Sequence, residues 1–460
     1  METSKQMGIL SREQALEIAR GLVESSTANE TEVVIESFAD RFVRFAATGP
    51  TQSADRERHE VSIRVRIDSD GGKREGAATC DGIDVALVNG ALERAVDLAR
   101  HAPPNPDLIP LGGPVDAEDR RPDLATLEHG FEPKADWIRT AIEACEREGL
   151  LPAGLTQTGG YARAVVNSSG RAVYAAQSRA SFALTASSPD LVGGAGFADQ
   201  TAASVAELDP DDVIRRAVLK AVQSRDSEPI EAGEYTVVLE PAAVSALLLF
   251  AGYKGFGCQD VEEQSSFLCG RLGERCLSEG FTVVDDASND DYPSIPFDFE
   301  GSPKSRVELI DNGLIKGMLT DHAWAAKLGV PNTGHGRHQP DPGGPTASSL
   351  CVQAGDQTLD ELIGGVERGL LITQFHYTNL IDPLELTLTG MTRNGTFLIE
   401  NGKVTRPVKN LRFTMSMVRA WSQITGVGSE LHVAGALFDG EVVTPALRID
   451  GFRFTSTTAF

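Results

Sequence analysis

The chain has 460 residues, of which 41% are hydrophobic and 6% aromatic, and its formal net charge is -24. This length exceeds what one hydrophobic core usually serves, so we expect a folded protein with two or three domains. The 66 acidic residues outnumber the 42 basic ones and no basic tract is present. Because nucleic acids are bound largely through clustered Lys and Arg, this balance argues against a nucleic-acid partner.

The cysteines and the apolar runs indicate the cellular compartment. Six cysteines are scattered without CxxC pairs, which is typical of thiols in a reducing compartment. The polar opening residues 1–6 lead into an amphipathic segment without the apolar core of a secretory signal. No apolar run reaches the ~18 residues of a membrane span. We therefore expect a cytoplasmic protein without a membrane partner.

The N-terminal region predicts a helix, then strands, then a second helix. Ser11 begins the first helix, and Gln14 stands where a capping box requires it. β-rich runs predict strands at residues 32–38, 42–47 and 61–67, the last with clean alternation. The second helix, over residues 84–100, is expected to bury a face made of Leu87, Ala91, Ala95 and Leu98.

The same order of elements is predicted again further along the chain. A helix over residues 134–147 precedes a group of three short β-rich runs, at residues 161–167, 172–176 and 181–185. Asp209 followed by Pro210 then begins another helix, as N-cap and first helical residue. The repetition indicates either an internal duplication or two α+β units that are alike by chance.

The second half of the chain is rich in strand and turn signals. The polar residues 224–229 are interpreted as a hinge into a strand at residues 235–239. The dipeptides Asn312-Gly313 and Asn401-Gly402 predict β-hairpins, and a helix is expected at residues 358–368. The fold class is therefore α+β.

We predict an N-terminal α/β domain over residues 1–228, in which the two helix-strands-helix units 1–125 and 126–228 are either a duplication or alike by chance. A β-rich C-terminal domain follows over residues 229–460.

Four segments, in order, resemble the TldD/PmbA family of metallopeptidases. They are an acidic-glycine turn at residues 299–306, a hairpin at 309–317, a TGNGRR-like loop at 333–338 and a second hairpin at 397–402. The resemblance spans much of the chain, and the ordered set is more specific than any single piece. It implies a two-subunit peptidase in which one chain carries a zinc helix with an HExxxH motif.

The segment 247–255 resembles the frame of that zinc helix but lacks its chemistry. Leu249 and Lys254 stand at the positions of the two histidines, and Phe250 stands at the position of the glutamate. No cysteine follows Cys351 to serve as the family's later metal ligand. The resemblance therefore implies the branch without the motif, a TldE-like pseudo-enzyme subunit with no catalytic residues and no cofactor of its own. Zinc is expected only in a TldD-like sister subunit. The partner of this chain is either that subunit or a second copy of the chain, with which it forms a dimer.

Such a subunit would help to enclose and bind a peptide or unfolded polypeptide during proteolysis. The candidate substrate-binding residues form one loop and one turn: Gly334, His335, Gly336, Arg337 and His338 in the loop, and Arg393 in the turn. Glycines allow close backbone approach to a ligand, and arginine can pair with a carboxylate. A solvated surface loop and a solvated hairpin tip are the alternatives.

Two other functions are compatible with the sequence. His322, His335 and His338 could hold a metal in a rebuilt site, which would make the chain an autonomous peptidase or hydrolase. Otherwise, the chain could be a binding or scaffold protein that keeps only the fold.

Overall fold

The computed structural model describes residues 8–190, 194–289, 292–437 and 440–458, so the polar opening residues 1–6 lie outside the described part. The N-terminal region contains a first unit of helix, three strands and helix, a short helix α3, and a second such unit that includes a 3-10 turn η1. The elements are α1 (Arg12–Ser25), β1 (Glu30–Ala46), β2 (Gly49–Ser69), β3 (Gly72–Asp81), α2 (Val85–His101), α3 (Leu124–Glu128), α4 (Phe131–Arg147), β4 (Leu151–Asn167), β5 (Ala172–Ser187), β6 (Ala195–Ala202), η1 (Val205–Glu207) and α5 (Pro210–Gln223).

The predicted repetition of helix, strands and helix is confirmed. Both units contribute to one antiparallel sheet in the order β3-β2-β1-β4-β5-β6, so the first strand of each unit lies at the centre. The predicted helix starts are also confirmed: Ser11 and Gln14 form a capping box, and Asp209 accepts a hydrogen bond from the backbone of Asp212.

The strands are longer than the sequence predicted. Residues 32–38 and 42–46 belong to the single strand β1, which ends one residue before the predicted end at residue 47, and residues 172–176 and 181–185 belong to β5. Polar Asp40 does not interrupt β1 because it pairs with Arg56 on one side and Gly159 on the other. Backbone pairing along both edges of β1 therefore outweighs the local preference of this polar residue for a turn. Strand β6 was not predicted from the sequence.

Helix α2 buries part of the predicted face: Ala91 and Ala95 are buried as predicted, but the two leucines are not. Leu87 and Leu98 are 46% and 54% exposed, so their predicted burial was wrong. The buried residues are Val88, Ala91, Leu92, Ala95, Val96 and Ala99. Small alanines at the centre allow the helix to lie close to β3, where a Cβ on Gly76 would meet the Ala95 carbonyl at 2.3 Å.

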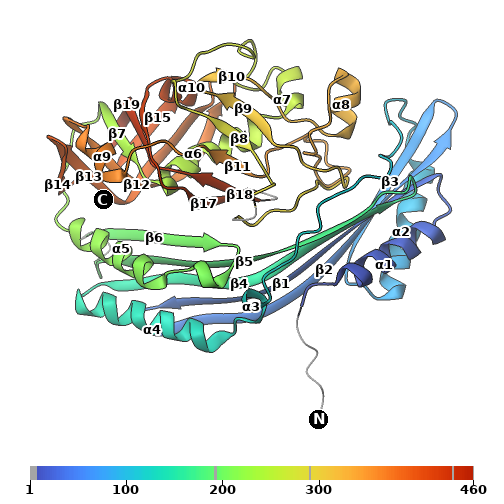
Figure 1. The fold of residues 1–460 in the computed structure, drawn as a ribbon, viewed down its shortest axis with the longest axis horizontal. Coiled ribbons are helices and arrows are strands. Elements are labelled where there is room, and N and C mark those ends of the chain that lie inside the picture. Colours follow the sequence, from blue (N-terminus) through green and yellow to red (C-terminus); the bar gives the residue numbers. More distant parts are fainter. Residues whose placement is uncertain (1–7, 191–193, 290–291, 438–439, 459–460) are drawn as a thin grey trace.

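The two faces of the N-terminal sheet have different neighbours. One face packs against α1 and α2 and, further along, against α4 and α5. On the opposite face, Val34 and Val165 pack against Ile295 and Phe297 from the second half of the chain. Figure 1 shows the C-terminal body lying over this second face.

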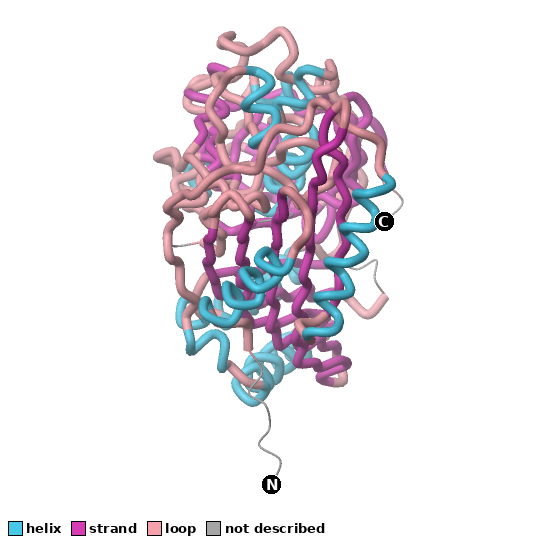
Figure 2. Tube along the Cα trace, turned by 90° about the vertical axis from the view of Figure 1, so that its right-hand side faces the viewer, coloured by secondary structure: helices cyan, strands magenta, loops and turns pink. Residues whose placement is uncertain are grey.

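The C-terminal body contains two further sheets with short helices between them. Its elements are β7 (Glu234–Leu239), α6 (Pro241–Lys254), α7 (Cys258–Glu262), β8 (Val283–Asp285), β9 (Val307–Asp311), β10 (Leu314–Ile315), α8 (His322–Leu328), β11 (Leu350–Val352), α9 (Leu359–Gly364), β12 (Arg368–Asp382), β13 (Thr387–Glu400), β14 (Lys403–Pro407), β15 (Leu411–Ser416), α10 (Met417–Trp421), β16 (Ile424–Val427), β17 (His432–Leu437), β18 (Gly440–Thr444) and β19 (Leu447–Thr457). Figure 2 shows how much loop connects them.

The strand pairings of the C-terminal body confirm the α+β prediction. One sheet has the order β10-β9-β8-β11-β18-β17. The other has the order β12-β7-β19-β15-β13-β14, and because β12 also pairs with β13 it closes into a small barrel. A large apolar core surrounds α6, which lies between these sheets.

The predicted hairpins of the C-terminal body are confirmed. Asn312 and Gly313 have φ angles of 49° and 79°, and Asn401 and Gly402 have 50° and 74°, as type I′ turns require. The predicted helix at residues 358–368 is shorter, because α9 ends at Gly364 and β12 begins at Arg368. The domain boundary at residue 228 stays a prediction. Within the described residues, no helix has the length and apolar character needed to cross a membrane.

Candidate functional site

The loop predicted to bind substrate, residues 333–338, packs against the turn 298–303. Gly334 has a φ of +73°, and a Cβ there would lie 2.2 Å from the Pro303 carbonyl oxygen. A Cβ on Gly336 would lie 2.9 Å from Asp298 Oδ2, the atom to which the Gly336 backbone N–H donates at 2.8 Å. Both glycines are therefore required for close packing.

His335 lies inside the protein. Its side chain is 0% exposed, its Nε2 lies 3.0 Å from Asp285 Oδ1, and its Nδ1 lies 2.9 Å from Thr333 Oγ1. Burial raises the pKa of the Asp285 carboxyl, but His335 and the backbone N–H of Ser348 outweigh it, and the net pKa is lowered. Both ring nitrogens thus have protein neighbours, which indicates a role in fixing the loop.

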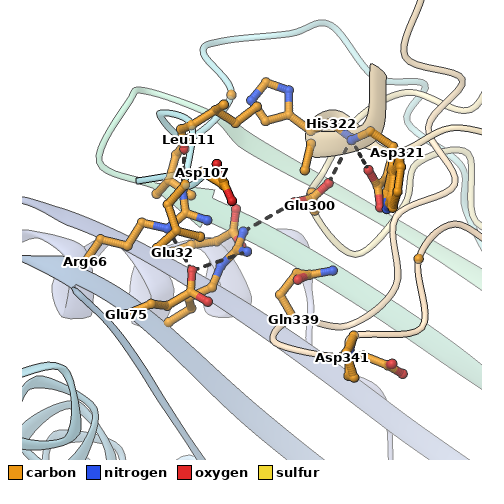
Figure 3. A pocket seen from close by; sticks show the side chains of 18 of the residues that line it. Glu32, Arg66, Glu75, Asp107, Leu111, Glu300, Asp321, His322, Gln339 and Asp341 are labelled. Atoms are coloured by element: carbon orange, nitrogen blue, oxygen red, sulfur yellow. Dashed lines mark hydrogen bonds and ion pairs between the residues drawn. The ribbon is translucent and has the colours of Figure 1, made fainter. Parts of the chain in front are cut away.

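Two cavities lie in this region of the structure, and one of them is lined by the loop. One, of about 220 Å³, is lined by residues 335–338 together with Asp298, Phe299 and Lys304. The other, of about 170 Å³, lies between β1 and β2 of the N-terminal sheet and the segments that carry Glu300, Asp321 and His322 (Figure 3). Asp341 lines both cavities. The two cavities therefore share Asp341, and the loop 335–338 lines only the one of about 220 Å³.

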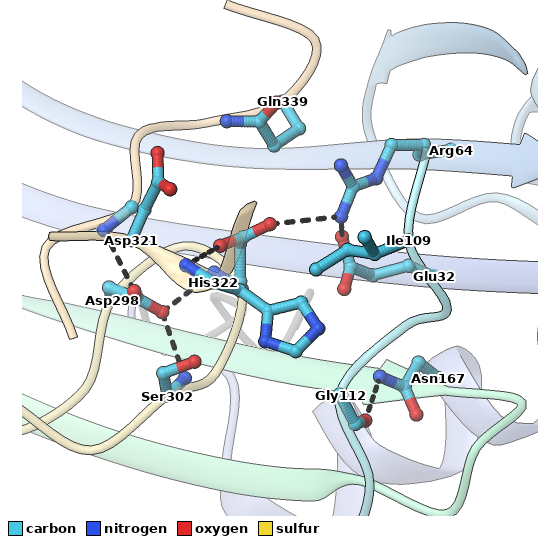
Figure 4. A network of polar contacts seen from close by, with 12 residues as sticks. Glu32, Arg64, Ile109, Gly112, Asn167, Asp298, Ser302, Asp321, His322 and Gln339 are labelled. Atoms are coloured by element: carbon cyan, nitrogen blue, oxygen red, sulfur yellow. Dashed lines mark hydrogen bonds and ion pairs between the residues drawn. The ribbon is translucent and has the colours of Figure 1, made fainter. Parts of the chain in front are cut away.

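A buried ionic network crosses the second cavity. Arg64 on β2 donates to Glu32 Oε1 at 2.5 Å and to Glu300 Oε1 at 3.4 Å (Figure 4). Its side chain is 6% exposed, and the side chains of Glu32 and Glu300 are 3% and 10% exposed. Burial lowers the pKa of Arg64, but the surrounding carboxylates raise it more, so the net pKa lies above the ordinary arginine value. The guanidinium thus joins the N-terminal sheet to the C-terminal body as a permanent cation.

Asp298 is the most strongly perturbed carboxyl beside the loop. It is 1% exposed and accepts backbone hydrogen bonds from Glu300, Ser302 and Gly336. Burial and the nearby Glu300 carboxylate outweigh these bonds and raise its pKa to about 7. The sequence resemblance placed an acidic-glycine turn here, but no pattern in the sequence indicated that it would be buried against β1 and β2.

The three histidines proposed as an alternative metal site do not form one ligand set. His322 lines the 170 Å³ cavity, and its Nε2 lies 2.9 Å from the Pro110 carbonyl oxygen. His335 and His338 line the other cavity. Among the described residues, the cluster with metal-ligating geometry includes His338 but neither of the other two histidines.

Arg337 and Arg393 lie in different places. The Arg337 side chain is 20% exposed, and its Nη1 lies 3.5 Å from Asp341 Oδ2. Arg393 is not at a turn, contrary to the prediction: it lies inside β13, with Nη1 3.4 Å from His376 Nδ1. Asn394 and Gly395 have positive φ angles of 57° and 121°, but they form a bulge after which β13 continues.

Helix α6 contains the three residues at the positions of the zinc motif. Leu249 and Phe250 are half-buried and pack against the apolar core. Lys254 Nζ lies 3.0 Å from Asp260 Oδ1, and the lysine side chain is 51% exposed. These side chains provide neither an imidazole nor a carboxylate for a metal ion.

Comparison with known proteins finds one family model and several curated relatives, each matching about half of the chain. Residues 232–456 match the PmbA/TldA metallopeptidase C-terminal domain. The chain is 30% identical over 251 residues to a metalloprotease TldD homolog of Haemophilus influenzae, which covers 51% of each chain. It is 26% identical over 200 residues to metalloprotease PmbA of Escherichia coli O157:H7, which covers 42% of this chain and 40% of that one. The chain thus spans about half the length of the curated relatives it matches.

Solved structures share the fold of nearly the whole chain. TldE from Thermococcus kodakarensis has a TM-score of 0.83 at 21% identity and covers 96% of this chain and 99% of its own. A protein from Thermotoga maritima described as a putative modulator of a DNA gyrase has a TM-score of 0.82 at 19% identity, over 95% and 99%. At these identities the likeness concerns the fold. By sequence, residues 232–456, just under half of the chain, thus match the C-terminal domain of the PmbA/TldA metallopeptidases.

Proposed function

We propose that this chain is a non-catalytic, TldE/PmbA-like subunit of a TldD/TldE-type metallopeptidase complex in the cytoplasm. Its partner is a zinc-bearing TldD-like subunit or a second copy of itself, and its role is to help enclose and bind peptide substrates. The observation that carries this proposal is the chemistry of α6. Leu249 and Phe250 are half-buried against an apolar core, and Lys254 is paired with Asp260.

The residues at the positions of the family's zinc motif do not fit the zinc ion that the family implies there. A catalytic zinc needs about three side-chain ligands and an open position for water. The sequence has one His-Glu dipeptide, His59-Glu60, with Arg64 where a second histidine would stand, and these residues lie on strand β2. No cysteine follows Cys351. We therefore derive no catalytic step through zinc in this chain.

Peptide binding without catalysis is supported by the junction between the sheet and the C-terminal body. A third cavity, of about 480 Å³, is lined by Glu36, Arg56, Tyr161 and Arg179 from the sheet together with Glu441 from β18. Its mixed charges and the neighbouring loop 335–338 offer donors and acceptors for a peptide backbone and its termini. The enclosure of a substrate needs these groups but no chemistry from α6.

Reconstitution tests this proposal. The chain is mixed with a TldD-like subunit that carries an HExxxH motif, and the complex is separated by size-exclusion chromatography and assayed on unstructured peptides. We expect a stable complex whose hydrolysis is lost when the motif glutamate of the TldD-like subunit is replaced. Lys254→Ala in this chain, the matched change at the corresponding helix, is expected to leave hydrolysis intact. Peptidase activity of this chain alone, sensitive to Lys254→Ala, would contradict the proposal.

A further inference from the structure

Three side chains with metal-ligating atoms meet where the loop 333–338 reaches the N-terminal sheet. Glu36 on β1 and Glu60 on β2 are direct partners in the antiparallel register. His338 reaches them from the loop, and one ligand atom from each of the three residues lies within 4.8 Å of the others. All three side chains are half-buried.

We propose that Glu36, Glu60 and His338 form a binding site for one divalent first-row transition-metal ion. Two carboxylates and one imidazole are ligands that Zn²⁺ and Mn²⁺ accept, and three protein ligands leave a position open for water or a substrate atom. The proposed function requires no metal in this chain, so this site goes beyond it. It also differs from the histidine set considered from sequence, from which only His338 takes part.

The register of the strands shows why a cation belongs here. Four residues before Glu36 on β1, Glu32 lies opposite Arg64 and the cross-strand charges cancel. On the same face of the sheet, Glu36 lies opposite Glu60. Like charges directly opposite one another on neighbouring strands are unfavourable. A divalent ion between the two carboxylates would remove this repulsion.

His338 is the group that the surrounding protein does not satisfy. Its Nε2 is buried and has no hydrogen-bond partner among the described residues. The ring lies edge-on to Phe299, with centroids 5.6 Å apart and an interplanar angle of 73°. A buried imidazole nitrogen without a partner costs free energy, and a metal bond is one way to use its lone pair.

The neighbouring groups hold the carboxylates in place and set the charge of the site. Tyr161 donates from its hydroxyl to Glu36 Oε1 at 2.5 Å, and Arg163 Nη2 lies 3.6 Å from the same oxygen. Arg58 forms an ion pair with Glu60 Oε2. Carboxylates can bind a metal and accept hydrogen bonds at once, and such outer contacts orient metal ligands. The two arginines reduce the negative charge of the site. Selectivity for one metal ion over another must therefore come from the imidazole ligand and from the geometry of the three ligands.

An ion can reach the site because its ligands border two cavities. Glu36 lines the 480 Å³ cavity and His338 lines the 220 Å³ cavity. A bound ion would connect β1 and β2 to the loop, as the Arg64 network does at the neighbouring cavity. Metal binding should therefore stabilise the junction between the sheet and the C-terminal body.

Isothermal titration of the full chain alone, after chelator treatment, tests the site with Zn²⁺ and Mn²⁺ as separate probes. We expect one ion per chain for at least one probe and a rise in melting temperature on binding. His338→Ala and Glu60→Gln should each weaken binding by about tenfold or more. His322→Ala, which removes a histidine outside the site, should bind like the unmodified chain. Circular dichroism identifies any variant that fails to fold. If either His338→Ala or Glu60→Gln fails to fold, the affinity of the other one tests the site.

The outcomes separate this site from the proposed function. The absence of saturable binding of either ion to the unmodified chain would overturn the site, as would unchanged affinity in folded His338→Ala and Glu60→Gln variants. Equal loss in His322→Ala would place the ion elsewhere and also overturn it. None of these results depends on complex formation with a TldD-like subunit or on peptide hydrolysis.

Discussion

Replacement of Arg64 by alanine tests the ionic connection between the N-terminal sheet and the C-terminal body. Arg64 is 6% exposed and contacts Glu32 on β1 and Glu300 in the C-terminal body. The alanine variant leaves both carboxylates buried without their cation. Removing one partner of a buried ion pair costs about 3–5 kcal/mol, and two stranded charges place the expected loss toward the upper end. This is a large part of the roughly 5–15 kcal/mol that stabilises a typical protein.

Urea unfolding at pH 7, followed by circular dichroism, measures this loss. Arg56→Ala is the matched control, because Arg56 lies on the same strand β2 but is 58% exposed in its ion pair with Asp40. An exposed pair contributes about 0–1 kcal/mol. Adding Glu32→Gln to the Arg64→Ala variant should recover part of the stability, since it removes one stranded charge. A loss within about 1 kcal/mol of the Arg56→Ala control would refute the reasoning.

Three further predictions concern the loop and its supports. Gly336→Ala should destabilise by about 1–3 kcal/mol in urea unfolding, because its Cβ would press on Asp298, whereas Gly364→Ala, with open space around its Cβ, should be neutral. The pKa of Asp298 is about 7 in the folded state and about 4 in the unfolded state. The free energy of unfolding should therefore fall as pH rises from about 5 to 7. Asp298→Asn should flatten this slope in unfolding curves measured across that range. The pKa of Asp285 is lowered, so its stabilisation is present above the unfolded pKa of about 4 and is lost as pH falls below it. His335→Ala should cost about 3 kcal/mol and move that acid loss to higher pH in thermal melts; an unchanged acid profile would contradict it.

Local signals predicted much of the fold. The capping box at Ser11, the Asp209-Pro210 helix start and the two Asn-Gly turns all act through neighbouring residues, and the structure confirms each. Strand lengths were wrong because β1 is stabilised by partners on both sides, β2 in the same hairpin and β4 more than 100 residues away in the sequence. On α2 the predicted burial of Ala91 and Ala95 is confirmed, but that of Leu87 and Leu98 was wrong, because small alanines fit the close contact with β3.

The candidate site was only partly predictable. Gly334 and Gly336 were identified as positions of close backbone approach, and the structure places them against Pro303 and Asp298, but substrate binding by this loop stays a prediction. No motif or periodicity indicated that Arg64 would contact Glu300, which is 236 positions away. Such pairs arise from the docking of the C-terminal body on the sheet, which periodicity and motifs do not encode.

Peptide turnover by separate and combined subunits tests the central claim most directly. The purified chain, the TldD-like subunit with its motif glutamate replaced, and the unmodified TldD-like subunit are assayed alone and in pairs on the same unstructured peptide. The account predicts turnover only where the intact HExxxH motif is present, with this chain increasing that turnover. Turnover by this chain alone, or by its pair with the inactivated subunit, would show that it has a catalytic site of its own and would contradict the account.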